Sequence, residues 1–109
     1  MVRFAAWLML TTVAGAVAAH AQPVGSVARG LNFVQQNCAR CHATAQSGDS
    51  PYAPAPPFRA SHERYDVANL AEAFAEGIVV AHDGTRQMPQ FKLPPDQIAD
   101  LIAYLKSLE

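Results

Sequence analysis

Apolar residues recur at helical spacing in three stretches of the chain, and the pattern is clearest near its end. Between Pro94 and Glu109 they occupy positions 98, 101, 102, 105 and 108, which is the i, i+3, i+4, i+7 stripe of a helix with one buried face. Pro94 and Pro95 suit the first turn of a helix, and Asp96 places a negative charge near its N-terminus. The pattern therefore predicts a helix that opens at Pro94–Asp96.

Two earlier stretches predict shorter helices. One runs from about Ser26 to Arg40, with Ser26 as its N-cap and apolar positions 27, 31, 34 and 38 on one face. The other runs from about Asp66 to Glu76. We expect Asp66 to cap this helix, positions 70 and 74 to face inward and Gly77 to stop it.

The segments between these helices predict loops. Four prolines within Pro51–Pro57 fix backbone angles and remove hydrogen-bond donors, which predicts an ordered, extended loop. Ile78–Lys92, which contains Gly84 and Pro89, predicts a second loop. Its run Ile78–Ala81 is strand-like but short, and we expect no partner for it. The predicted fold class is therefore all-α, with three main helices.

The N-terminal segment has the three parts of a secretory signal peptide. Arg3 precedes the apolar stretch Phe4–Ala19, and Ala19–Ala21 supplies small residues at a cleavage point. A retained membrane anchor is the alternative, but 16 residues fall short of the roughly 18 needed to span a bilayer. Residues 1–21 are therefore predicted to be removed, leaving one domain at 22–109 that is exported to the periplasm.

The charge of the remaining domain argues against two kinds of partner. Without Arg3 it keeps seven basic residues against nine acidic ones. A balance so close to neutral does not favour binding to nucleic acid or to an anionic membrane surface. A domain of this size buries a modest share of its surface and is marginally stable alone. A large apolar ligand would supply additional core.

The chemistry concentrates in the segment Cys38–His42, whose pattern is C-x-x-C-H. Residues three and four apart lie on one face of a helix, so both thiols and the imidazole can face one flat ligand. The pattern is the signature of c-type haem attachment, with thioethers to Cys38 and Cys41 and with His42 on the iron. A redox-active dithiol would need a strand–helix context, and a zinc site would need four ligands.

Met88 is the predicted second axial ligand of the iron. It is the only methionine after the signal segment, and Pro89 stiffens its loop. A thioether opposite histidine raises the reduction potential of the iron. The alternatives for this position are His82, His62, or an open or water-bound iron. Met88 would then only fill a gap in the core, which is the usual role of a methionine.

These features together resemble the class I cytochrome c family over nearly all of the predicted domain. The resemblance rests on Gly30 eight residues before the Cys38–His42 motif, on the Met88–Pro89 pair, and on the ending Leu101–Leu105. It implies three main helices packed around one covalently attached haem c.

The resemblance also implies specific contacts. Gly30 would let the first helix cross closely over the last, near Leu101 and Tyr104. A carbonyl of the Pro54–Pro57 loop would accept a hydrogen bond from His42 and so set its tautomer. The tryptophan that many relatives place near a haem propionate is missing, and three side chains are candidates to replace it: Arg59, Tyr52 and Tyr65.

The predicted function is transfer of one electron at a time, without enzymatic catalysis or a small-molecule substrate. With both axial positions filled no substrate reaches the iron, and apolar residues at 91, 98 and 101 are expected to exclude water from the haem. Donor and acceptor proteins would dock transiently through small interfaces. The alternatives are a haem enzyme or gas sensor with a displaceable sixth ligand, and a dedicated cytochrome subunit of a dehydrogenase complex.

Overall fold

The structure is a computed structural model that describes residues 14–16, 24–78 and 88–109. The predicted signal peptide at 1–21 therefore lies almost wholly outside the described residues, and so does His82. Among the described residues the chain is helical and contains no strand, as predicted. In chain order the elements are α1 (Val27–Asn37), the 3-10 helices η1 (Phe58–Glu63) and η2 (Val67–Asn69), α2 (Leu70–Glu76) and α3 (Pro95–Lys106).

Helix α1 begins as predicted but ends earlier. The Oγ of Ser26 accepts a hydrogen bond from the Arg29 N–H at 3.2 Å, which caps the first turn. The helix stops at Asn37 instead of reaching Arg40, and the Cys38 N–H closes it on the Val34 carbonyl at 2.8 Å. The two cysteines therefore lie in the turn after α1 and not on the helix itself.

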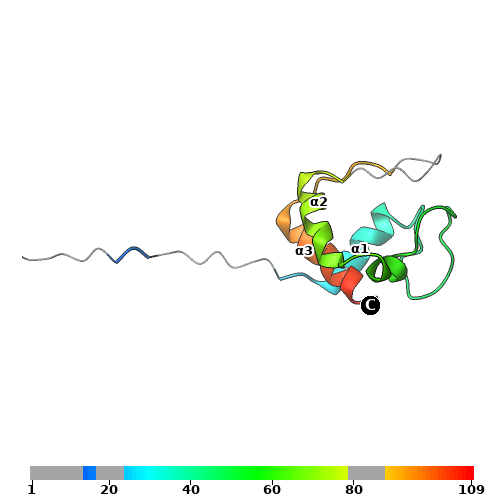
Figure 1. Ribbon diagram of the computed structural model, residues 1–109, viewed down its shortest axis with the longest axis horizontal. Coiled ribbons are helices and arrows are strands. Elements are labelled where there is room, and N and C mark those ends of the chain that lie inside the picture. The colour runs from blue at the N-terminus through cyan, green and yellow to red at the C-terminus, as the bar shows by residue number, and fades with distance from the viewer. Residues whose placement is uncertain (1–13, 17–23, 79–87) are drawn as a thin grey trace, which may run out of the picture.

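Helices α1 and α3 cross at close range because small residues lie at the crossing (Figure 1). A Cβ at Gly30 would stand 2.1 Å from the Asp100 carbonyl oxygen and 2.7 Å from the Tyr104 Cβ. A Cβ at Gly25, which the sequence did not single out, would stand 2.0 Å from the Ala99 carbonyl oxygen. The role implied for Gly30 is confirmed, with Asp100 and Tyr104 as the contacted residues.

An ion pair ties the same two helices together. The Arg29 guanidinium donates to both carboxylate oxygens of Asp100 at 2.8 Å, and the Ser26 N–H donates to the same carboxylate at 2.7 Å. These donors, the guanidinium first, hold the pKa of the Asp100 carboxyl below its usual range. Buried Asp100 thus joins the start of α1 to the middle of α3.

The core forms between α3 and the elements packed on it. Most of the predicted inward positions are confirmed, including Phe74 on α2 and the stripe on α3. Val27 is an exception, because it is 48% exposed at the start of α1. The buried cluster comprises Val34, Val67, Phe74, Ile98, Leu101, Tyr104, Leu105 and Leu108.

The second predicted helix is split in two. The Asp66 carboxylate accepts from the Ala68 N–H at 2.9 Å and caps the 3-10 turn η2, which leads directly into α2. Gly77 ends α2 with a φ of +108°, a left-handed conformation that favours glycine. The expectation that Ile78 has no partner was wrong, because it forms an isolated antiparallel bridge with Phe91.

One element, η1, was not predicted at all. It follows Pro57, which lies in extended conformation, so the proline-rich loop runs directly into a single 3-10 stretch. This stretch carries no apolar stripe of the kind used to predict the other helices. Among the described residues, no helix has the length and apolar character required to cross a membrane.

Candidate functional site

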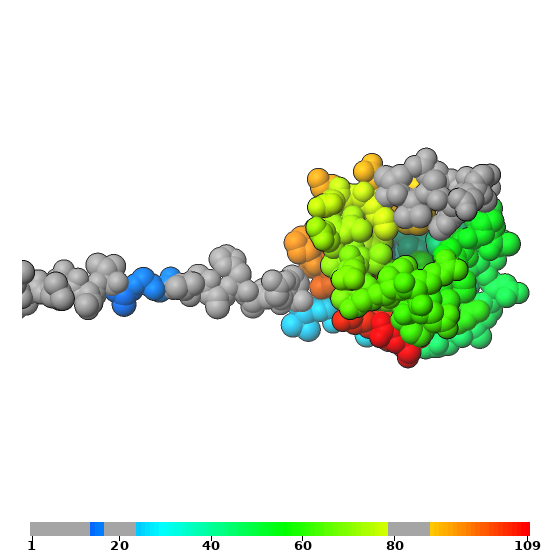
Figure 2. All heavy atoms as spheres, in the orientation of Figure 1, coloured from blue at the N-terminus to red at the C-terminus, as the bar shows by residue number. Residues whose placement is uncertain are grey.

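A cavity of about 780 Å³ lies between α1, α2, α3, η1 and the segment that contains Met88. Its mouth is visible as a hollow between the green and yellow-green segments of the space-filling view (Figure 2). The volume falls in the range of cofactor sites. Its apolar walls come from separate parts of the chain: Phe33, Ala55, Phe58, Leu70, Phe74, Ile78, Phe91, Leu101 and Leu105. Ile98, which was expected beside Phe91 and Leu101, packs in the core instead.

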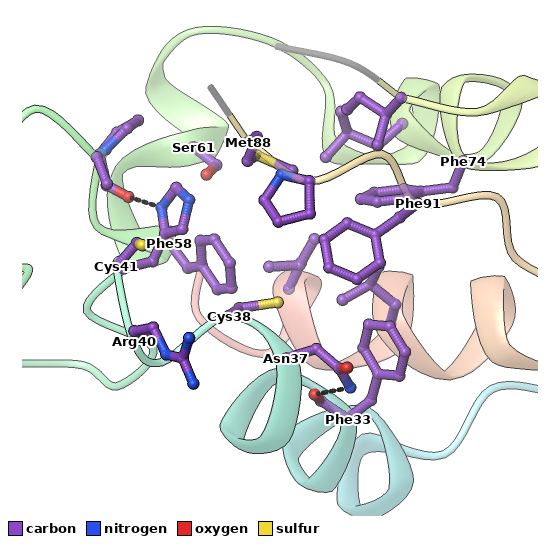
Figure 3. Close-up of a pocket in the computed structure, with 18 of the residues that line it drawn as sticks. Phe33, Asn37, Cys38, Arg40, Cys41, Phe58, Ser61, Phe74, Met88 and Phe91 are labelled. Atoms are coloured by element: carbon purple, nitrogen blue, oxygen red, sulfur yellow. Dashed lines mark hydrogen bonds between the residues drawn. The ribbon is translucent and has the colours of Figure 1, made fainter. Parts of the chain in front are cut away.

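Both cysteines line this cavity from the turn that follows α1. The Cys41 and His42 N–H groups donate to the Cys38 carbonyl at 3.1 and 3.0 Å, so the turn keeps near-helical geometry after the helix has ended. The Cys38 sulfur points into the cavity (Figure 3). The two half-buried thiols do not form a disulfide, and burial, with a smaller effect of Cys41, raises the pKa of the Cys38 thiol to about 11.

His42 is oriented by the proline-rich loop. Its Nδ1 lies 2.7 Å from the Pro56 carbonyl oxygen. Because a carbonyl only accepts, Nδ1 carries the proton in this contact, and Nε2 is the nitrogen with the lone pair of the neutral ring. The imidazole is buried, lines the cavity and packs on Phe58 with ring centroids 4.8 Å apart. The structure thus selects Pro56 among the loop carbonyls that the resemblance implied.

The loop reaches His42 because three backbone groups fold it back on the motif. The Tyr52 N–H donates to the Cys41 carbonyl at 3.1 Å, and the Phe58 N–H donates to the Ala43 carbonyl at 3.0 Å. The Ala43 N–H in turn donates to Ser50 Oγ at 3.0 Å. These three hydrogen bonds hold the proline-rich loop close to the Cys38–His42 segment.

Met88 lines the cavity on the wall away from Cys38 (Figure 3). The segment that follows Met88 is held by the bridge between Ile78 and Phe91, with N···O distances of 3.0 and 3.3 Å. The Leu93 N–H then donates to the Phe74 carbonyl at 2.9 Å. Among the alternatives, His62 is exposed on η1 and does not line the cavity, whereas His82 lies outside the described residues.

Several polar side chains line the cavity that the sequence did not single out. Ser61, on η1, is 7% exposed, and Arg64 follows it by three residues. Tyr52 and Tyr65, two of the candidates to replace the missing tryptophan, line the cavity as well. Arg59 does not, because its guanidinium donates to the Gly48 carbonyl at 2.7 Å. Arg64 follows Ser61 by three residues, one turn of a 3-10 helix, but it lies just after η1, which carries no apolar stripe from which it could have been predicted.

The zinc alternative finds no support in the part of the chain described. No group of three or more histidine, cysteine, aspartate or glutamate side chains is arranged there to hold a metal ion. The donors that do meet are two thiols and one imidazole on the wall of a mostly apolar cavity. That set fits a flat, apolar ligand that carries its own metal.

Comparison with known protein families decides the class. The family model for cytochrome c matches residues 27–109. The chain belongs to the cytochrome c family. The same comparisons found no match among curated proteins and none among solved structures.

Membership in the cytochrome c family establishes the cofactor and the general activity. The family binds haem c covalently through a C-x-x-C-H motif, and Cys38 and Cys41 have that spacing. The domain is a haem-binding electron carrier that acts with redox partners, and family members in bacteria are typically periplasmic or extracellular. The apolar cavity, the free thiols and the fixed tautomer of His42 all fit haem c.

Proposed function

We propose that this chain is a periplasmic carrier of single electrons whose haem c is bound through Cys38 and Cys41, with His42 and Met88 as axial ligands. The observation that carries the proposal is the 2.7 Å contact between His42 Nδ1 and the Pro56 carbonyl. It leaves Nε2 as the nitrogen that can ligate the iron, in the same cavity that the two thiols and Met88 line.

The thiols would hold the ring on one edge. Each thiol would add across one vinyl group of haem, with its sulfur bound to one vinyl carbon and its hydrogen to the other. Since Cys38 and Cys41 belong to one turn with a fixed hydrogen-bond pattern, two thioethers would fix the ring relative to His42. The Pro56 carbonyl accepts a hydrogen bond from Nδ1 of the imidazole, which would fix the orientation of the ring and of its ligating nitrogen Nε2.

Met88 is the proposed sixth ligand because of its position in the cavity and because the chain next to it is held in place. It lies across the cavity from Cys38, and the bridge at Phe91 holds the chain just beyond it. Bound haem supplies a reversible one-electron iron couple, and a methionine thioether raises its reduction potential. Phe91 and Leu101 line the cavity and exclude water, which favours the less charged reduced state.

The location and the mode of action follow from the rest of the chain. Cleavage after residue 21 would release residues 22–109 into the periplasm, where the cysteines are joined to haem. With both axial positions filled, electrons would pass at an exposed haem edge to transiently docked proteins, through small interfaces. No enzymatic step is proposed.

The first test is periplasmic expression together with the haem-attachment machinery. We expect the mass of residues 22–109 plus one haem, and a pyridine haemochrome spectrum of haem with both vinyl groups converted to thioethers. A mass equal to that of the polypeptide alone would reject covalent attachment. Retention of residues 1–21 would reject cleavage and point to a membrane-anchored carrier.

The second test concerns Met88. We expect Met88→Ala to lose the red-region methionine–iron charge-transfer band, to lower the reduction potential and to bind external ligands such as carbon monoxide. His62→Ala is the control and should leave all three unchanged. An unchanged spectrum in Met88→Ala would mean that another residue is the sixth ligand of the iron.

A high-spin ferric spectrum in the unaltered protein, with rapid ligand binding, would favour a haem enzyme or gas sensor. Copurification with a larger dehydrogenase would identify a subunit of a complex.

A further inference from the structure

Tyr104 carries a buried hydroxyl that lies outside the haem cavity. The residue belongs to α3, is 6% exposed and does not line the cavity. Its hydroxyl donates to the Thr44 carbonyl, 60 residues earlier in the chain. Burial raises the pKa of the Tyr104 phenol, so the hydroxyl keeps its proton and remains a donor at neutral pH. The bond therefore joins α3 to the backbone that follows the haem-attachment motif.

The residue next to His42 is bound to the proline-rich loop. The Ala43 N–H donates to Ser50 Oγ and the Ala43 carbonyl accepts from the Phe58 N–H, both at 3.0 Å. The same loop supplies the Pro56 carbonyl, 2.7 Å from the Nδ1 of His42. These bonds fix the loop relative to the backbone at His42, but they do not fix either of them relative to α3.

Tyr104 connects this backbone to the helix crossing. Its Cβ packs at the crossing, where a Cβ on Gly30 would stand 2.7 Å away, and its hydroxyl binds Thr44 from the other end of the ring. A second contact in this region runs from Gln46 Nε2 to the Ser107 carbonyl. It is exposed and 3.5 Å long, which is beyond the usual length of a hydrogen bond. Because a hydrogen bond is stronger when it is shielded from water, Tyr104 is the firmer of the two connections.

We propose that Tyr104 is a positioning residue for the axial ligand, because its hydrogen bond to Thr44 holds the adjacent backbone of His42 against α3. The contact between His42 and the Pro56 carbonyl is thereby kept short. The inference rests on the proposed function, in which His42 ligates the iron. Since Tyr104 does not line the cavity, it acts only through the segment that it binds. The sequence pointed to this tyrosine for its place at the helix crossing and not for its hydroxyl.

The effect would reach the iron through the imidazole. A hydrogen bond from Nδ1 to a carbonyl makes the imidazole a more basic ligand, which stabilises the more positive ferric iron. Without the Tyr104 hydroxyl, the Thr44 carbonyl loses its donor and the backbone at His42 gains freedom to move away from α3. The bond to Pro56 is then weaker on average. Its proton exchanges faster with water, and the reduction potential rises.

Tyr104→Phe tests the hydroxyl alone, because it keeps the aromatic ring in the helix crossing. Ile98→Val is the matched control, since it removes one methyl group from the buried face of the same helix at a comparable cost in stability. NMR of the reduced holoprotein measures the exchange of the His42 Nδ1 proton with water. In Tyr104→Phe we expect this exchange to be about fivefold faster, the factor that one typical hydrogen bond contributes. We also expect a higher reduction potential in Tyr104→Phe, whereas Ile98→Val should match the unaltered protein in both measurements.

The outcome for Tyr104 is separable from that for the proposed function. Only protein with the mass of covalent haem is compared, and the ring-current shift of the His42 ring protons reports whether this residue ligates the iron. Absence of that shift in the unaltered protein would reject the proposed function itself. If the shift is present and Tyr104→Phe behaves like Ile98→Val, the positioning role is overturned while the proposed function stands.

A measurement on the unaltered protein keeps the test decisive if Tyr104→Phe folds poorly. The Tyr104 hydroxyl proton should exchange slowly enough to give an NMR signal with a nuclear Overhauser contact to Thr44. The hydroxyl of Tyr65, which is 44% exposed, is the comparison and should exchange rapidly. Equally rapid exchange at Tyr104 would overturn the proposal, because the bond to Thr44 would not persist in solution.

Discussion

The contact between α1 and α3 and the wall of the haem cavity differ in how complete they are without a cofactor. At the helix crossing, Val34 and Leu101 are 0% and 2% exposed, and Gly30 leaves room for no additional carbon atom. Across the molecule, η1, α2 and the proline-rich loop surround about 780 Å³ that the protein does not fill. One region is closed by its own side chains, and the other is shaped for a ligand.

This difference shows where haem contributes to stability. The crossing derives its stability from close packing and from the bonds of Asp100 to Arg29 and Ser26. The cavity wall consists of apolar residues whose burial depends on an apolar body between them. In a domain this small, a cavity of that size leaves little net stability. Haem therefore acts as part of the core as well as the redox centre.

The largest effect is expected from removal of haem attachment. Cys38→Ala combined with Cys41→Ala should give almost no stable holoprotein, because the cavity region loses the ligand that fills it. Thermal unfolding followed by circular dichroism and by haem absorbance measures the loss. Cooperative unfolding of a haem-free double variant at the temperature of the holoprotein would show that the cavity region does not depend on haem.

The next effect tests the packed region. Gly30→Ala places a Cβ 2.1 Å from the Asp100 carbonyl oxygen, so the helices must move apart. We expect a loss of about 3 kcal/mol in the free energy of unfolding, as for other overpacked cores. Urea unfolding of the holoprotein measures it, with Gln35→Ala on the exposed face of α1 as the control. Equal stability of the two variants would mean that the crossing adapts easily.

The smallest effect concerns the ion pair at the crossing and depends on pH. The folded chain holds the pKa of Asp100 below its usual value. The stabilisation is therefore complete above the pKa of the unfolded chain, and it is lost as pH falls through the lower pKa of the folded chain. Asp100→Asn should lower the urea midpoint at neutral pH, and the difference from the parent should shrink in strong acid.

A double-variant cycle attributes this effect to the correct partner. Arg29→Gln removes the first and strongest cause of the pKa shift. If the two side chains act as a pair, Arg29→Gln combined with Asp100→Asn costs less than the sum of the single changes. Full additivity of the two, or a difference that persists unchanged in acid, would assign the stability of the crossing to packing alone.

The features that the sequence predicted correctly are those encoded over short distances. Ser26 and Asp66 cap helices because their side chains reach an N–H two or three residues ahead. Gly77 ends α2 because its φ is positive. The end of α1 and the 3-10 helix η1 were missed because no apolar repeat marks either of them. The partner of Ile78 was missed because Phe91 is distant in sequence.

The candidate site divides in the same way. The spacing of Cys38, Cys41 and His42 is a local property, and it predicted the cofactor. Taken with Gly30, the Met88–Pro89 pair and the ending Leu101–Leu105, it carried the resemblance to the family that the comparison then showed. The participation of Met88 and the cleavage after residue 21 stay predictions that the experiments above address. The resemblance offered Arg59 as one replacement for the missing tryptophan, whereas in the structure its guanidinium donates to the Gly48 carbonyl.

The sequence by itself determined the helical class and the attachment motif, because each depends on neighbouring residues or on one recognisable pattern. Only the tertiary structure decided that Pro56 orients His42, that Arg64 lines the cavity while Arg59 binds Gly48, and that Asp100 joins α3 to α1. In each case several chemically similar groups could have formed the contact. Which of them does so depends on how the loops close and how the helices cross, and both are set by contacts between residues far apart in the chain.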